Sequence, residues 1–303
     1  MSAITEILGK VGDSREIAHY LGVYGSTDPP KRGVIKISGS CLQGSSLERL
    51  AEDLTHLQQV GFIPTVTHGW GAELSAILEE SGIENKFVNG DRYTDERIIS
   101  EVVSIAKRKG VELKDAIEAQ GGKAAFLGIS QRVIRSQDKN DSRYGSNNGD
   151  PVGVNLHPVY DAIEQGIIPI VTPIGVSQDN PSKLHNLNSA RIGALLTRAI
   201  DPVKYLMVTS SGGVLDKSNN VISEIVLRRD LQELVRTEVI SEGMLLNAEE
   251  AARSLYERGP LGDDRSAQIV GPGNLLHELY THKGKGTFIR TGYEIEKKPI
   301  SEV

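Results

Sequence analysis

A lysine that comes just before a turn of small residues is the part of the sequence most able to carry chemistry. Residues 34–40 read VIKISGS, an apolar run that brings Lys36 to a turn containing Gly39. The small residues leave backbone N–H groups unshielded and let the chain approach a bulky group, while Lys36 adds a compact positive charge. This combination suits a phosphate or a carboxylate, although a lysine before a glycine turn is also typical of a solvated strand end.

A second apolar strand ends in a similar turn. Residues 62–67 lead into His68-Gly69-Trp70-Gly71. His68 at this position is more typical of a structural turn histidine than of a base. Trp70 either narrows a ligand pocket or packs in the core. Because the two turns follow consecutive strands, we expect a ligand between them, at the carboxyl ends of the strands.

The elements that must position these turns alternate between strand and helix. Residues 45–48 (SSLE) have a capping-box pattern and begin a helix that continues to Val60, and a helix over 73–80 follows the second turn. The second half repeats the alternation, with predicted elements at 188–200, 205–208, about 228–236 and 245–257, 267–270, 275–280 and 287–290. This order predicts a parallel or mixed sheet covered by helices.

Two segments lie outside this alternation. Residues 1–28 contain an amphipathic helical arm, which packs either on another subunit or on its own domain. Residues 121–150 look like two strands with a very polar, flexible connection. We predict no functional site in that connection.

Composition and charge exclude several classes of protein. The 303 residues carry a net charge of -6, which leaves no basic surface for nucleic acid. The single cysteine, Cys41, rules out an internal disulfide. No apolar stretch approaches the roughly 18 residues of a membrane span, and the polar start lacks the apolar core of a signal peptide. We therefore expect a cytoplasmic protein that contacts neither nucleic acid nor membrane and has no metal site of its own.

Six short motifs in a fixed order resemble those of the amino-acid kinase family, most closely arginine-responsive N-acetylglutamate kinase and the kinase-like domain of N-acetylglutamate synthase. The resemblance covers about residues 30–292. In chain order the motifs are KISGS (36–40), HGWG (68–71), RYTD (92–95), NLNSA (186–190), TSSGG (209–213) and GMLLN (243–247). The helical arm and the segment 278–287 are also similar to the arginine-responsive branch.

This resemblance implies a fold and a division of the chain. The fold is an α/β three-layer αβα sandwich with a mainly parallel central sheet, preceded by the helical arm at 1–28. Residues 29–185 would form an N-terminal lobe on the acyl-amino-acid side. Residues 186–303 would form a C-terminal lobe with the nucleotide side and an arginine site. In this branch the arm helps to build a homo-oligomer.

The family transfers the γ-phosphoryl group of ATP, with magnesium, to a carboxylate, and the resemblance gives Lys36 the role of its first catalytic lysine. The organising aspartate, the second lysine and the nucleotide-side aspartate are replaced here by Ala190, Asn247 and Ser210. All three departures remove charge, and each lost charged contact costs on the order of a few kcal/mol in the transition state. Ordinary kinase turnover is therefore not expected, unless Lys204 or Lys217 replaces the second lysine.

The resemblance also implies three sets of ligand-binding residues. The substrate set is Gly39, Gly69, Trp70, Gly71, Arg92, Asn186 and Asn188. The nucleotide set is Thr209, Gly213 and Lys217. The arginine set is Glu278, Gly284 and Gly286.

Four of these side chains also have a structural interpretation. Arg92 reaches outward, either to bind an α-carboxylate in a two-pronged geometry or as an exposed arginine at a helix start. Asn186 and Asn188 bind the amide and carboxylate of a substrate or cap the helix that begins there. Glu278 contacts arginine or is a solvated carboxylate at a helix end.

We predict a kinase-fold protein with a degenerate transfer site that binds a small acyl-amino acid and acts as a regulatory or assembly subunit in arginine-type metabolism. The acetyltransferase domain that accompanies such a domain in the synthases is then expected on a separate chain. One alternative is an active kinase that uses Mg-ATP to phosphorylate the carboxylate of N-acetylglutamate or a related amino acid. A third is different chemistry in the same fold, with Trp70 as its marker.

Overall fold

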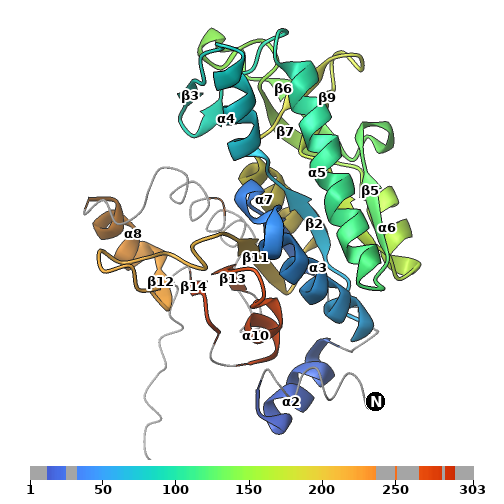
Figure 1. Ribbon diagram of the computed structural model, residues 1–303, viewed down its shortest axis with the longest axis vertical. Helices are drawn as coiled ribbons and strands as arrows, with labels where there is room; N and C mark the ends of the chain where they lie inside the picture. The colour runs from blue at the N-terminus through green and yellow to red at the C-terminus, as the bar shows by residue number, and fades with distance from the viewer. Residues whose placement is uncertain (1–11, 25–32, 237–249, 251–265, 282–283, 291–303) are drawn as a thin grey trace, which may run out of the picture.

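The computed structural model of the protein describes residues 12–24, 33–236, 250, 266–281 and 284–290. Its centre is an eight-stranded sheet with the order β12-β14-β13-β11-β1-β2-β8-β5 (Figure 1). Every neighbouring pair is parallel except β13 with β14. The strands are β1 (Gly33–Ile37), β2 (Thr65–His68), β5 (Ala124–Leu127), β8 (Ile168–Val171), β11 (Lys204–Val208), β12 (Glu224–Val226), β13 (Ser266–Val270) and β14 (Thr287–Arg290).

Helices cover both faces of this sheet. One core joins it to α2 (Ser14–Tyr24), α3 (Gly44–Gln59), α5 (Ile99–Ala119) and α10 (Leu275–Tyr280). The other core joins it to α6 (His157–Glu164), α7 (Ser189–Ile200) and α8 (Leu227–Arg236). Strand β1 shows the alternation, because Ile35 and Ile37 enter the first core and Val34 enters the second. The predicted three-layer sandwich with a mainly parallel sheet is confirmed.

The helical arm packs on its own chain where it is described. Helix α2 contacts α10, and Ile17 is buried in the first core. In Figure 1 this helix lies at the end of the molecule opposite to α4 (Gly71–Glu80). The described part of the arm thus lies on its own chain, while a role of the arm in assembly stays a prediction, as does the division into lobes.

A smaller four-stranded sheet, of order β10-β9-β6-β7, stands beside the central one. Its strands are β6 (Ile134–Asp138), β7 (Gly149–Val154), β9 (Ile174–Ser177) and β10 (Leu184–Asn186). A short hairpin, β3 (Phe87–Val88) with β4 (Asp91–Arg92), completes the sheets. The segment 121–150 therefore holds β5, β6 and the start of β7, one strand more than the sequence predicted.

Two further observations concern a membrane-spanning helix and a metal-binding cluster. No helix in the described ranges is long and apolar enough to cross a membrane. The same ranges contain no group of three or more histidine, cysteine and carboxylate side chains placed to hold a metal ion. The predicted helix at 245–257 lies outside the described residues.

Candidate functional site

The two glycine turns meet at the carboxyl ends of β1 and β2. The backbone N–H of Gly69 donates to the carbonyl of Ile37 at 2.8 Å. A Cβ on Gly39 would lie 2.7 Å from Trp70 Cα, so the two turns pack backbone against backbone and position 39 requires glycine. A Cβ on Gly69 would lie 3.1 Å from Ser189 Oγ, which brings the start of α7 to the same place. The structure thus brings three of the predicted segments together.

Lys36 lies directly behind these turns. Its side chain is only 5% exposed, and its ammonium donates to Ser38 Oγ at 3.1 Å. Gly193 of α7 leaves space for the Lys36 side chain, since a Cβ at position 193 would lie 3.2 Å from Lys36 Cβ. Burial lowers the pKa of Lys36 from 10.5 to about 8. A bound anion would favour the charged form, so this lysine is suited to an oxyanion ligand.

The turn after β11 adjoins the Lys36 turn. The N–H of Ser38 donates to the carbonyl of Val208 at 2.9 Å, and Ser40 Oγ contacts Ser210 Oγ at 3.4 Å. A Cβ on Gly213 would lie 2.6 Å from a methyl group of Val221, so this glycine too is required by packing. Thr209 is buried, and its hydroxyl lies 3.1 Å from that of Ser211. These side chains are all neutral, including that of Ser210, which stands where the resemblance expects an aspartate.

The two lysines considered as replacements lie elsewhere. Lys204 is the first residue of β11 and pairs with Gly33, four positions before the strand end. At about 3.3 Å per residue this places its Cα about 13 Å from the glycine turns, so the suggestion that Lys204 replaces the second lysine is wrong. Lys217 is exposed in a tight turn closed by the Asp216 N–H and the Asn220 carbonyl at 2.8 Å. No described contact links Lys217 to Lys36, and Asn247 lies outside the described residues.

The asparagines at the start of α7 both hold structure in place. Asn188 caps the helix, because its Oδ1 accepts the N–H of Ala190 at 3.0 Å. Its Nδ2 donates to the carbonyl of Gly90 and to Asp91 Oδ1, each at 3.1 Å. Asn186 donates to Thr94 Oγ1 at 2.8 Å. The capping interpretation therefore holds for Asn188, and a direct role of either residue in ligand binding stays a prediction.

Trp70 and His68 belong to the core. Trp70 is 6% exposed and packs with apolar side chains of α4 and α5. His68 is fully buried, with its ring centroid 6.2 Å from that of Trp70. Burial lowers the pKa of His68 to about 4, so the ring is neutral at pH 7. Both residues follow the structural alternative that the sequence left open.

Arg92 does not reach outward as expected. Its side chain is buried, and its Nη2 donates to the carbonyl of Gly71 at 2.7 Å and to Ser75 Oγ at 2.9 Å. A further N–H meets Asn85 Oδ1, and the guanidinium lies over the ring of Phe87, 4.5 Å from its centroid. Burial lowers the pKa of Arg92 to about 10, which leaves it charged at pH 7. Its hydrogen-bond acceptors among the described residues are all neutral.

The hairpin that carries Arg92 is fixed at its turn. Asn89 and Gly90 have φ values of 49° and 77°, as a two-residue hairpin turn requires. Asn89 donates to the hydroxyl of Tyr144 at 2.9 Å, and Asn188 bonds to the hairpin as described above. The hairpin is therefore bound on one side by the 138–150 segment and on the other by α7.

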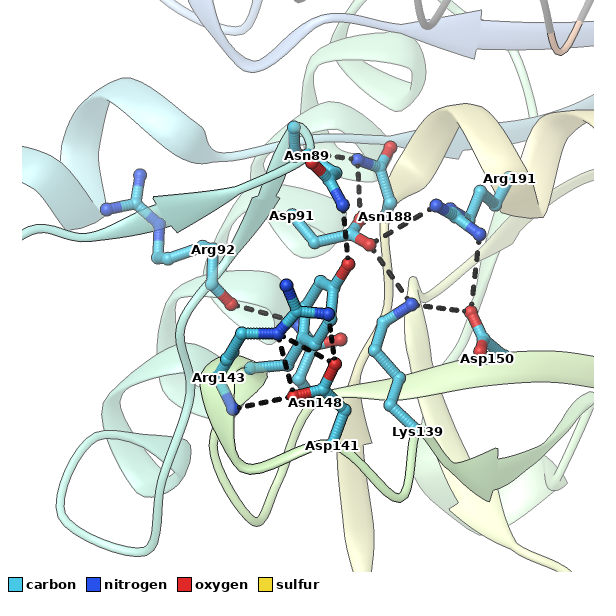
Figure 2. Close-up of polar contacts among 12 residues, drawn as sticks. Asn89, Asp91, Arg92, Lys139, Asp141, Arg143, Asn148, Asp150, Asn188 and Arg191 are labelled. Atoms are coloured by element: carbon cyan, nitrogen blue, oxygen red, sulfur yellow. Dashed lines mark hydrogen bonds and ion pairs between the residues drawn. The ribbon is translucent and has the colours of Figure 1, made fainter.

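Four charged residues join these parts, and Figure 2 shows them converging from β4, from the loop after β6, from β7 and from α7. This charge cluster consists of Asp91, Lys139, Asp150 and Arg191. Lys139 Nζ lies 3.1 Å from Asp91 Oδ2 and 2.7 Å from Asp150 Oδ1. Arg191 lies 3.3 Å from each of the two carboxylates. Asp91 is 3% exposed, so the cluster holds the hairpin with a buried, compensated charge.

The sequence prediction missed this cluster. The polar connection within residues 121–150 was expected to be flexible and without a site, but this segment supplies two of the four charges, Lys139 and Asp150. The polar residues of this connection do not recur at a helical or strand spacing, so the sequence pattern does not predict that any of them is buried. The available signal was Asp91, an acid placed between a hairpin turn and Arg92.

A separate trio has the distances of a nucleophilic triad. Ser136 Oγ lies 2.9 Å from His185 Nδ1, and His185 Nε2 lies 2.9 Å from Asp138 Oδ1. Ser136 and His185 are fully buried, and a Cβ on Gly175 would collide with the serine side chain. A hydroxyl enclosed in this way cannot meet a substrate. The trio therefore links β6 to β10 and does not support catalysis by serine.

Glu278 is not the solvated carboxylate that its structural interpretation assumed. It is 4% exposed and accepts the backbone N–H groups of Lys285 at 3.1 Å and Gly286 at 3.3 Å. A Cβ on Gly284 would collide with this carboxylate, and one on Gly286 would collide with the carbonyl of Ile269. Burial raises the pKa of Glu278. The structure thus brings the three predicted arginine-site residues together, with Glu278 bound by its own chain.

Known proteins resemble this chain in sequence and in fold. It is 32% identical over 286 residues to an acetylglutamate kinase of Xanthomonas campestris, a match that covers 94% of the chain but only 65% of that relative. An acetylglutamate kinase of Clostridioides difficile is 30% identical over 265 residues, covering 85% of the chain and 90% of the relative. N-acetylglutamate synthase from Neisseria gonorrhoeae, solved with coenzyme A and N-acetyl-glutamate, has the same fold, with a TM-score of 0.77 at 21% identity over 91% of this chain and 62% of the other.

A family model agrees with these matches. The model described as the amino acid kinase family matches residues 31–260, which include both glycine turns, the hairpin, the charge cluster and the turn after β11. The family resemblance expected from the six motifs is therefore confirmed. The chain belongs to the amino acid kinase family.

Proposed function

We propose that this protein binds a small N-acylated amino acid at the glycine turns, as an acetylglutamate-kinase-like protein whose phosphoryl-transfer site is degenerate. The observation that carries this proposal is that two neutral residues, Ala190 and Ser210, stand where the resemblance expects carboxylates. Ala190 is 2% exposed in the first turn of α7, and Ser210 follows β11 beside Ser40. Among the described residues, the buried cations beside the glycine turns are Lys36 and Arg92, whose guanidinium donates to the carbonyl of Gly71.

Phosphoryl transfer from ATP depends on charge at these positions. Cations must offset the charge on the phosphoryl oxygens, and carboxylates must hold the metal and orient the cations. Lys36 would contact a phosphate if ATP and magnesium bound here, and Thr209 and Gly213 would lie on the nucleotide side. Because the carboxylates are missing at Ala190 and Ser210, we expect weak use of Mg-ATP and a rate reduced by factors of hundreds or more.

The ligand side keeps its charge. Arg92 is a buried cation whose described acceptors are neutral, and Lys36 is a buried lysine with a lowered pKa. A carboxylate gains more from a desolvated cation than from an exposed one. A ligand with one or two carboxylates and an amide therefore suits this side, which favours N-acetylglutamate or a related acid.

A ligand-binding subunit without fast turnover is suited to regulation or assembly. We propose such a role in arginine-type metabolism in the cytoplasm, with a homo-oligomer built through the arm. Arginine would bind near Glu278, Gly284 and Gly286. This part rests on the family and on the compact arrangement of these three residues.

Thermal unfolding with separate ligands tests the proposal. N-acetylglutamate should raise the melting temperature, because a ligand that binds only the folded state stabilises it, and Mg-ATP should not. Lys36→Ala should reduce the N-acetylglutamate shift. An equal shift with Mg-ATP would contradict the degenerate site.

The second candidate is an active acetylglutamate kinase, favoured by the 30% identity over 90% of the length of the Clostridioides difficile enzyme. ADP release with a panel of N-acylated acids distinguishes the two. Activity that Lys36→Ala abolishes would establish the kinase. If the wild type stays at the level of Lys36→Ala, the double variant Ala190→Asp, Ser210→Asp should show a gain in Mg-ATP binding.

A further inference from the structure

A second pocket opens on the four-stranded sheet and shares no residue with the site at the glycine turns. It has a volume of about 470 Å³. Its polar lining consists of Arg132, Arg135, Asn155, Ser177 and Gln178. This lining contains no acidic side chain. A pocket of this size accommodates a small metabolite.

Both arginines are available to a ligand. Neither guanidinium forms a hydrogen bond or an ion pair with any part of the chain that the structure describes. By contrast, Arg97 and Arg143, which are also exposed, pair with Asp95 and Asp141 at 2.7 Å and 2.6 Å. In a protein with a net charge of -6, two unpaired arginines in one pocket are an unusual concentration of positive charge.

The backbone around the pocket fits this use of the two side chains. Arg135 lies on the outer face of β6, opposite Gly153 of β7, where a Cβ would lie 2.7 Å from its Nη2. Glycine at 153 therefore lets the guanidinium lie flat across the sheet. Arg132 has a φ of 47°, a conformation that is uncommon for a residue with a side chain. The chain adopts it directly after the short helix Ile129–Gln131, where the arginine enters the pocket lining.

We propose that this pocket binds a small polyvalent oxyanion, the phosphate group or the paired carboxylates of a metabolite, as a site separate from the glycine turns. The planar guanidinium groups of Arg132 and Arg135 match oxyanion oxygens in a two-pronged geometry. The buried hydroxyl of Ser177 and the side-chain amides of Asn155 and Gln178 supply neutral donors. Asp179 follows Gln178 in the chain but does not line the pocket.

Isothermal titration of the full chain at constant ionic strength tests this site, with inorganic phosphate and citrate as separate probes. We expect the wild type to bind at least one of them, and the stronger probe identifies the phosphate or the carboxylate source. The double variant Arg132→Gln, Arg135→Gln should bind it roughly tenfold more weakly or worse, since charge-assisted hydrogen bonds are lost. The double variant Arg97→Gln, Arg143→Gln removes the same charge elsewhere and should keep the affinity within about twofold.

Two further variants keep the test decisive. Arg135→Lys retains the charge but loses the planar guanidinium, so it should weaken binding. This single variant still tests the site if the double variant does not fold. Lys36→Ala should leave the affinity unchanged, which separates this pocket from the glycine turns. Binding of neither probe at millimolar concentration, an unchanged affinity in the arginine variants, or a loss in Lys36→Ala would overturn the proposal.

Discussion

Replacing Asp91 by asparagine should destabilise the protein through the charge cluster. The substitution keeps the size of the side chain and an acceptor for Asn188, but it removes the carboxylate that faces Lys139 at 3.1 Å and Arg191 at 3.3 Å. Two cations then share Asp150 alone. Because Asp91 is 3% exposed, water cannot replace it without opening the hairpin.

The expected loss follows from the burial of each partner. Removing one member of a fully buried ion pair costs about 3–5 kcal/mol. Here the side chains of Arg191 and Asp150 keep 26% and 35% exposure, and Asp150 still compensates part of the charge. We therefore expect the free energy of unfolding to fall by about 2 kcal/mol.

Urea unfolding measures this loss as a lower midpoint with an unchanged slope. Asp141→Asn is the matched control in the same segment, since Asp141 pairs with Arg143, whose side chain is 68% exposed, and it should leave the midpoint nearly unchanged. Combining Asp91→Asn with Lys139→Met should cost less than the sum of the two single changes. A loss below about 0.5 kcal/mol for Asp91→Asn, or additive effects, would refute the idea that the cluster holds the hairpin.

Three more predictions concern single positions. The pKa of Lys36 is about 8 in the folded protein and 10.5 in the unfolded chain, so between these pH values the unfolded chain binds more protons. The free energy of unfolding should therefore rise with pH over this range. In urea unfolding, Lys36→Met should show no such rise and should be more stable than the wild type at pH 7. Burial raises the pKa of Asp53 from 3.8 to about 7, so stability should fall as pH rises between these values, and Asp53→Asn should flatten the curve. Gly39→Ala places a Cβ 2.7 Å from Trp70 Cα and should abolish the N-acetylglutamate shift, whereas Gly22→Ala, with no atom within 4 Å, should raise the melting temperature slightly.

The sequence predicted the parts of the fold that periodicity controls. Apolar runs of 4–6 residues gave the central strands, and the small-residue turns after them gave the place where β1, β2 and β11 end together. These features depend on short-range patterns and on the general rule that parallel strands end at one edge. The motif order then indicated the family, which the comparisons confirmed.

What the sequence could not predict is how polar side chains pair across long distances. The burial of Arg92 depends on Gly71 and Ser75, which are 21 and 17 residues away, and that of Glu278 depends on a loop folding back over it. Charged residues such as Lys139 are exposed in most proteins, so their type alone argues against burial. Only the contacts show that these charges are compensated or enclosed.

The two sides of the site differ in what holds them, and this difference is the strongest argument for a binding role. The ligand side is fixed by the hairpin turn, by the asparagine cap of α7 and by a buried charge cluster, each of which costs free energy if one partner is lost. The proposed nucleotide side has serine and threonine hydroxyls and the buried Ala190, which are neutral and need no such compensation. This contrast is what supports the proposal above, in which these residues serve ligand recognition rather than phosphoryl transfer.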